Sequence, residues 1–142
     1  MGINKIKTAS GEINISDSKG EFTLGTASGD IEASNMEFTA ESSLSTASGE
    51  ISVELAKSLT YDMTLSTASG NVDLDYNGND VKGFFEFTAR KDKGKIVSPF
   101  KFDKEEVIEK NGKEYDKKSF TKGGVSPKVY LKTASGTVRL EK

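Results

Sequence analysis

Residues 46–53 read Thr-Ala-Ser-Gly-Glu-Ile-Ser-Val, and this stretch decides the fold because the chain repeats it. The tetrad Thr-Ala-Ser-Gly occurs five times unchanged, beginning at Thr8, Thr26, Thr46, Thr67 and Thr133. The first four copies follow one another at short, similar intervals, and a long gap precedes the fifth. After each glycine, polar and apolar residues alternate for four positions, which is the pattern of a half-buried strand. The repeat therefore predicts short strands at regular intervals.

A period of about 20 residues is typical of solenoids, in which one coil cannot bury its own apolar face and must stack on the next. We predict an all-β fold, a single-chain β-solenoid (β-helix) of about 18–21-residue coils whose strands stack into ladders of like residues about 4.8 Å apart. One ladder is expected to contain Ile13, Ile31, Ile51, Val72 and Val138, and its neighbour Ile15, Ala33, Val53, Leu74 and Leu140. A second wall of the core is expected to contain Phe22, Phe38 and Met63, with Leu24, Ala40 and Leu65.

The tetrads are expected to form the corners between strands. Glycine accepts a positive φ without a Cβ clash, and the threonine and serine hydroxyls can hydrogen-bond corner backbone groups that leave the ladder. The residues assigned to these structural corners are Thr8, Ser10, Gly11, Thr26, Ser28, Gly29, Thr46, Ser48, Gly49, Thr67, Ser69, Gly70, Thr133, Ser135 and Gly136.

Residues 75–132 interrupt the repeat. Lys-Gly-Lys-Ile-Val at 93–97 resembles a worn copy, which indicates a further, longer coil. Asn111-Gly112 separates two extended runs and predicts a β-hairpin with a type I′ turn that protrudes from the stack, with a helical turn over 103–108 as the alternative. The single domain, residues 1–142, thus divides into regular coils (1–74), an irregular coil with the hairpin (75–128) and a closing coil (129–142).

The hairpin is the expected contact for a partner, because loops on a rigid scaffold commonly carry function. Asn111, Gly112 and Tyr115 are the candidate contact residues. Deleting residues 103–122 is expected to leave the rest of the stack folded. The partner is expected to be a protein or a cell-envelope component.

Composition excludes several kinds of site. The 142 residues include no cysteine, histidine or tryptophan, which removes disulfides, thiolate or imidazole metal ligands and histidine-assisted catalysis. We expect no catalytic residues, no cofactor and no metal. No apolar run approaches the roughly 18 residues that span a membrane.

Charge is distributed unevenly along the chain. Residues 1–89 carry a net charge of −9 and residues 90–142 one of +7, which gives −2 overall. A basic half can attract phosphate-rich partners, but its lysines are interleaved with carboxylates such as Glu105, Glu106 and Glu109. We therefore predict a solvated, mixed-charge surface and no nucleic-acid partner.

Three other functions fit parts of the pattern. Stacked corner hydroxyls resemble the rows of ice-binding solenoids, although the coil length varies. Glycine followed by Glu12, Asp30 or Glu50 resembles a calcium-binding roll, but these carboxylates should face solvent. A polysaccharide-processing β-helix needs two carboxylates roughly 5–10 Å apart in a groove, and four tyrosines at no shared repeat position offer little aromatic surface for sugars.

The ends of the stack carry their own expectations. Open ends expose unpaired strand edges and invite end-to-end self-association, which Arg139, Glu141 and Lys142 in the closing coil should discourage. The first residues enter mid-repeat without a recognisable cap. We therefore expect the chain to be a segment of a longer repeat protein.

The repeat Thr-Ala-Ser-Gly-(Glu/Asp/Asn)-(Ile/Val)-x-(Ile/Val/Leu) resembles a bacterial adhesin-like repeat family, a domain of unknown function. The resemblance covers residues 1–74 closely and residues 125–142 again. It implies a right-handed β-solenoid without catalytic residues, in a bacterial cell envelope and in a Gram-positive setting. The leading hypothesis is a non-catalytic, envelope-associated domain that presents a rigid binding surface; an intracellular protein-binding scaffold is the other non-enzymatic alternative.

Overall fold

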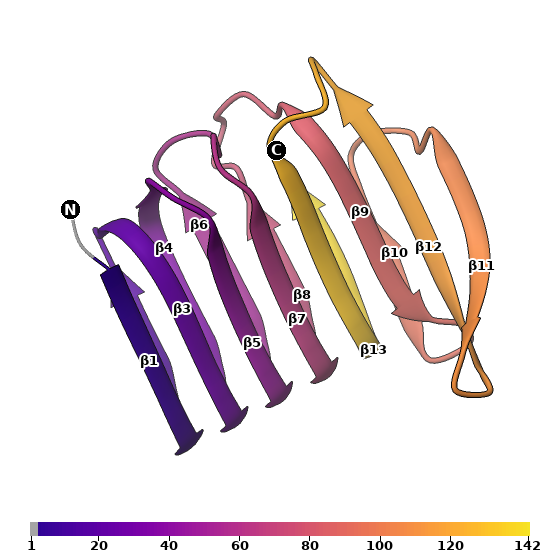
Figure 1. Cartoon of the computed structure of the whole chain (residues 1–142), viewed down its shortest axis with the longest axis horizontal. Coiled ribbons are helices and arrows are strands. Elements are labelled where there is room, and N and C mark those ends of the chain that lie inside the picture. Colours follow the sequence, from indigo (N-terminus) through magenta and orange to yellow (C-terminus); the bar gives the residue numbers. More distant parts are fainter. Residues whose placement is uncertain (1–2) are drawn as a thin grey trace.

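The computed structural model describes residues 3–142, so the first two residues of the predicted regular coils lie outside the described residues. Within that range the chain forms thirteen β-strands and no helix (Figure 1), which confirms the all-β class. The strands are β1 Ile3–Ser10, β2 Ile13–Ser16, β3 Lys19–Ser28, β4 Ile31–Phe38, β5 Ser42–Ser48, β6 Ile51–Leu55, β7 Met63–Ser69, β8 Val72–Asp75, β9 Gly83–Arg90, β10 Gly94–Val97, β11 Lys104–Lys110, β12 Lys113–Lys122 and β13 Lys128–Glu141. None of these described elements is a helix able to cross a membrane.

The strands lie in two layers that face each other across the core, in a β-solenoid-like stack (Figure 1). The front layer has the order β1-β3-β5-β7-β13-β9-β12-β11, and the back layer has the order β2-β4-β6-β8-β13-β10. All neighbouring strands are parallel except in the pairs β9–β12 and β12–β11, which are antiparallel. Each tetrad carries the chain from the front layer to the back. Thr26 pairs with Thr46 and Thr46 with Thr67, so the copies lie in register.

The ladders of the back layer are those predicted from the sequence. Ile31 pairs with Ile51, Ile51 with Val72, and Val72 with Val138. The front layer differs at two residues. Leu24, Leu44, Leu65, Leu131 and Phe87 form one ladder, and Ser42, Met63, Val129 and Phe85 form the next. Phe38 lies instead at the end of β4 and Ala40 beyond it, and the Phe38 ring packs edge-on against Phe22 with centroids 5.6 Å apart.

The last strand does not extend the end of the stack, contrary to the expectation of a closing coil. β13 inserts between β7 and β9 in the front layer and between β8 and β10 in the back layer. In this position the Thr133 hydroxyl donates to the Gly70 carbonyl, as the hydroxyls of Thr46 and Thr67 donate to the glycine carbonyls of their neighbouring coils. β9 carries Ala89 at that position and lies outside the five identical copies. The terminal charges therefore lie within the stack and do not protect its end.

The predicted hairpin is present, but it pairs with β9 and so continues the front layer. It does not protrude from the stack as predicted. β11 pairs with β12, and β12 pairs with β9 from Tyr115–Arg90 to Lys122–Gly83. Asn111 and Gly112 form the two-residue turn and both have a positive φ, as a type I′ turn requires. The Phe120 ring is buried and stacks on Phe85 with centroids 5.0 Å apart. Removing residues 103–122 would take away Phe120 and uncover Phe85, so this packing favours a destabilising effect of the deletion over the tolerance predicted from the sequence.

Candidate functional site

The corner threonines are structural residues. Thr67 is buried, and its hydroxyl lies 3.1 Å from the carbonyl oxygen of Gly49 and 3.2 Å from that of Ser69. The same pair of contacts recurs at Thr46 and Thr133, while Thr8 and Thr26 contact only the serine carbonyl of their own tetrad. All the corner threonines except the first are buried, so the threonine hydroxyls do not form an exposed row.

The corner serines contribute through their backbone. The Gly49 amide donates to the Ser69 carbonyl at 2.9 Å, and the equivalent bond recurs at Gly11, Gly29 and Gly70. Across residues 3–142 the side chains of the five corner serines make no hydrogen bond, contrary to expectation, because most point into solvent. Four of the five corner glycines, all but Gly11, are closely covered: a Cβ on Gly70, for example, would lie 1.9 Å from the Gly49 carbonyl oxygen. The tetrads thus hold one coil to the next.

A groove on the outer face of the front layer contains two of the three expected contact residues. Asn111 and Tyr115 line a cavity of about 360 Å³ between the hairpin and β7, β13 and β9. Gly112 lies at the tip of the turn and is not part of the lining. We call this cavity the hairpin groove.

Three lysines give the hairpin groove a positive charge. Lys117 Nζ lies 3.1 Å from Glu86 Oε1 and 4.0 Å from Glu106 Oε1. The hydrogen bond to Glu86 and the charge of that carboxylate raise the pKa of Lys117. Lys110 and Lys132 also line the groove, are exposed, and form no ion pair within the described part of the chain.

Sequence reasoning missed the side of the groove that comes from the repeat. Ser66, Lys132 and Thr88 lie on three neighbouring strands and are aligned in one row. Ser66 and Lys132 each stand directly before a tetrad, the position that carries Gly25 and Ser45 in other copies. The signal available in the sequence was Lys132, a lysine at a repeat position where other copies carry a small residue. The residues beside Lys132 in space follow only from the insertion of β13.

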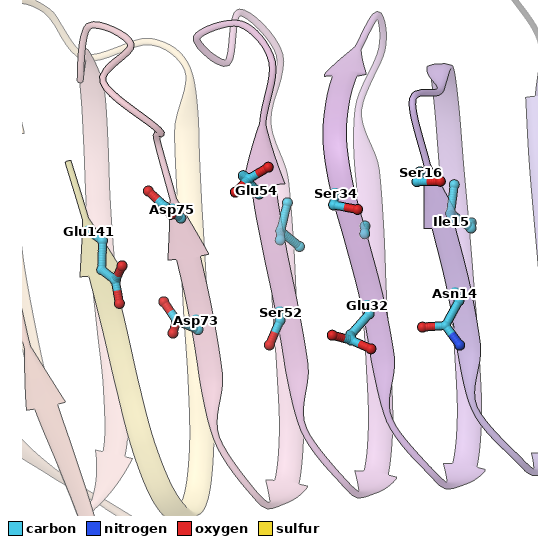
Figure 2. A pocket seen from close by; sticks show the side chains of 12 residues that line it. Asn14, Ile15, Ser16, Glu32, Ser34, Ser52, Glu54, Asp73, Asp75 and Glu141 are labelled. Atoms are coloured by element: carbon cyan, nitrogen blue, oxygen red, sulfur yellow. The ribbon is translucent and has the colours of Figure 1, made fainter.

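A second groove, of about 450 Å³, lies on the outer face of the back layer. Figure 2 shows its side chains in two rows that cross β2, β4, β6, β8 and the end of β13. Five carboxylates line it: Glu32, Glu54, Asp73, Asp75 and Glu141. No aromatic side chain of residues 3–142 lines this groove. Glu54, Asp75 and Glu141 are aligned on adjacent strands. We call this cavity the acidic groove.

Asp73 is the perturbed carboxyl of the acidic groove. Burial raises the pKa of Asp73 above its ordinary value of 3.8, and the neighbouring Glu141 and Asp75 raise it further, while Arg139 lowers it. One carboxyl oxygen, Oδ1, is buried without a hydrogen-bonding partner among the described protein groups. Within residues 3–142, no three acidic side chains are placed to hold a metal ion.

Comparison with known proteins identifies the family. Residues 2–97 match the profile of the family described as Toastrack DUF4097. The match ends before the hairpin and β13, and so does not extend to residues 125–142, where a resemblance was also expected. Neither the curated proteins nor the solved structures gave a significant match. Because the profile covers more than half of the chain, this protein belongs to the Toastrack DUF4097 family, a family of domains of unknown function.

Proposed function

We propose that this domain is a non-catalytic binding module of the bacterial cell envelope, in a Gram-positive setting, and that it meets its partner in the hairpin groove. One observation carries the proposal: the stack and the hairpin together form a groove whose walls come from distant parts of the sequence. Ser66 and Lys132 are far apart in the chain and adjacent in the fold. Paired strands hold both walls, so the groove is largely preformed, as is usual for binding sites.

The supporting scaffold is proposed to be a right-handed β-solenoid with coils of about 18–21 residues, the range typical of short repeats. Parallel crossover connections are right-handed in nearly all known cases, and the strand registers of the regular coils are compatible with this coil length. An experimental structure of the chain tests this winding, and a left-handed path from β3 through β4 to β5 would contradict it.

Cosedimentation with purified Gram-positive cell walls tests the binding function. We expect the wild-type protein to sediment with the walls and Tyr115→Ala to sediment several-fold less, because Tyr115 lines the groove. Tyr61→Ala is the matched control, since Tyr61 is an exposed tyrosine outside the groove. Wild-type protein that stays in the supernatant, or equal loss with both variants, would overturn the proposal. Fractionation of cells separates it from the intracellular scaffold, which predicts the protein in the cytosol.

The acidic groove supports one second candidate, a polysaccharide-processing activity. A carboxyl with a raised pKa beside an ionised one is the arrangement of a general acid and its partner. The Asp73 carboxyl, whose pKa is raised, lies beside the carboxyl of Glu141. Turnover on a panel of glycans, abolished by Asp73→Asn, would support this candidate. The absence of aromatic residues from the described lining weighs against it, because sugar sites commonly stack their ligand on such rings.

A further inference from the structure

The charge of the hairpin groove that is not neutralised by an ion pair is positive, and two lysines carry it. Glu86 neutralises Lys117 at 3.1 Å, which leaves Lys110 on the hairpin and Lys132 on β13 without a carboxylate partner in residues 3–142. Lys132 projects from the repeat and Lys110 from the hairpin, so the two ammonium groups come from opposite walls. A ligand lying between them can meet both charges at once.

The lining between the lysines is suited to a sugar ring. Tyr115 and Ile108 are directly opposite each other across the hairpin, and both are partly buried. They offer an apolar surface for the C–H face of a sugar. Ser66, Thr88 and Asn111 line the groove as well, and their hydroxyl and amide groups can hydrogen-bond its hydroxyls. Lysines, one aromatic ring and several small polar groups together match a sugar that carries an acid.

The two grooves carry opposite charge: three lysines and one glutamate line the hairpin groove, and five carboxylates line the acidic groove. Side chains alternate between the two faces of a strand. Ser66, Thr88 and Lys132 alternate with buried residues and therefore point outward from the front layer, whereas Glu32 and Asp73 point outward from the back layer. A polyanion is thus attracted to the front face and repelled by the acidic groove. This separation would orient the domain on an anionic polymer.

We propose that the hairpin groove binds an anionic glycan, with its acidic groups at Lys110 and Lys132 and a sugar ring on Tyr115. The inference rests on the proposed function and specifies its ligand. A glycan fits better than single-stranded nucleic acid, whose bases need successive aromatic platforms. Tyr115 is the one aromatic residue among the described lining residues of this groove.

Isothermal titration calorimetry with oligogalacturonate, a neutral malto-oligosaccharide of equal length and a short poly-uridine RNA tests the ligand class. We expect binding of the acidic glycan, weakened about tenfold or more by Lys132→Ala and by Tyr115→Ala, as for central contacts in an interface. Lys95→Ala removes the same charge from an exposed lysine on β10 of the back layer and should leave the affinity unchanged.

Each contrary result has a defined meaning. Equal binding of the neutral glycan, or equal weakening by Lys95→Ala, would overturn the proposal that Lys110 and Lys132 bind the acidic groups of the glycan. RNA that binds as tightly as the glycan would also overturn it and indicate a general polyanion site. A protein that sediments with cell walls but does not bind oligogalacturonate would refute this inference and leave the proposed function standing. A protein that binds neither would refute both.

Discussion

A β-carbon placed on Gly49 would lie 2.0 Å from the carbonyl oxygen of Gly29 in the neighbouring coil. This close approach couples the tetrad sequence to the stacking of coils, because only glycine leaves room for the next corner. Gly11 offers a natural comparison, since it has a similar positive φ of +122° but nothing within 4 Å of a Cβ.

Gly49→Ala should therefore destabilise far more than Gly11→Ala. Both substitutions strain the backbone by about 1–3 kcal/mol, but only Gly49→Ala also forces two coils apart, for a total loss above about 4 kcal/mol. Urea denaturation followed by circular dichroism measures both free energies of unfolding. Equal losses in the two variants would show that backbone strain alone selects the glycine.

Thr67→Val should lower the free energy of unfolding by about 1–2 kcal/mol, the usual cost of losing a buried hydrogen bond. The substitution removes the hydroxyl that donates to the corner carbonyls while preserving the shape. Thr64→Val is the control, since Thr64 lies three residues earlier on β7 and points outward. The same denaturation experiment compares the two. A loss in Thr64→Val as large as in Thr67→Val would count against a special role for the corner hydroxyl.

Tyr76→Phe should leave stability unchanged or raise the free energy of unfolding by about 1 kcal/mol, because removing an unsatisfied buried hydroxyl relieves its desolvation cost. The Tyr76 ring is fully buried and packs edge-on against Phe85 with centroids 5.9 Å apart, whereas its hydroxyl has no partner among the described protein groups. Thermal melts measure the change against Tyr130→Phe, a partly exposed control. A marked drop in Tm for Tyr76→Phe would mean that the hydroxyl has a bonding partner.

Asp73→Asn should stabilise the protein at neutral pH and not in acid. The pKa of Asp73 in the folded state is raised above 3.8. Between the unfolded and the folded pKa, the folded state therefore holds a proton that the unfolded chain has lost. Its contribution to stability therefore falls as the pH rises from the unfolded pKa through the folded pKa and stays low above it. We expect a Tm about 2–5 °C above wild type at neutral pH and no difference in acid below both pKa values. Asp80→Asn, at an exposed loop carboxylate, should not reproduce this pattern.

Much of the fold follows from local patterns in the sequence. The alternation after each tetrad places Ile31, Ile51 and Val72 in one ladder, because a strand has a side-chain period of two. Asn111-Gly112 likewise specifies its turn, since few other pairs accept two positive φ values. These features depend on residues within a few positions of one another.

The order of the coils and the composition of the hairpin groove depend on choices between distant segments. β13 could in principle follow β9, and no local signal shows that Thr133 prefers the neighbourhood of Gly70. The pairing of β12 with β9 depends on Phe120 meeting Phe85 and Phe87, an aromatic match between separate parts of the sequence. For this reason the hairpin that holds Asn111 and Tyr115 was predictable, while the placement of Ser66, Thr88 and Lys132 in the same groove was not.

Cysteine cross-linking tests the insertion of β13 most directly, because the natural chain has no cysteine. Lys132 is aligned with Ser66 on one side and with Thr88 on the other, at a strand spacing of about 4.8 Å that a disulfide can bridge. Oxidation should therefore cross-link Ser66→Cys with Lys132→Cys, and Thr88→Cys with Lys132→Cys. It should not cross-link Ser66→Cys with Thr88→Cys, which lie two strands apart. Efficient cross-linking of that third pair, with failure of the pair Ser66→Cys and Lys132→Cys, would place β9 beside β7 and contradict both the coil order and the groove built on it.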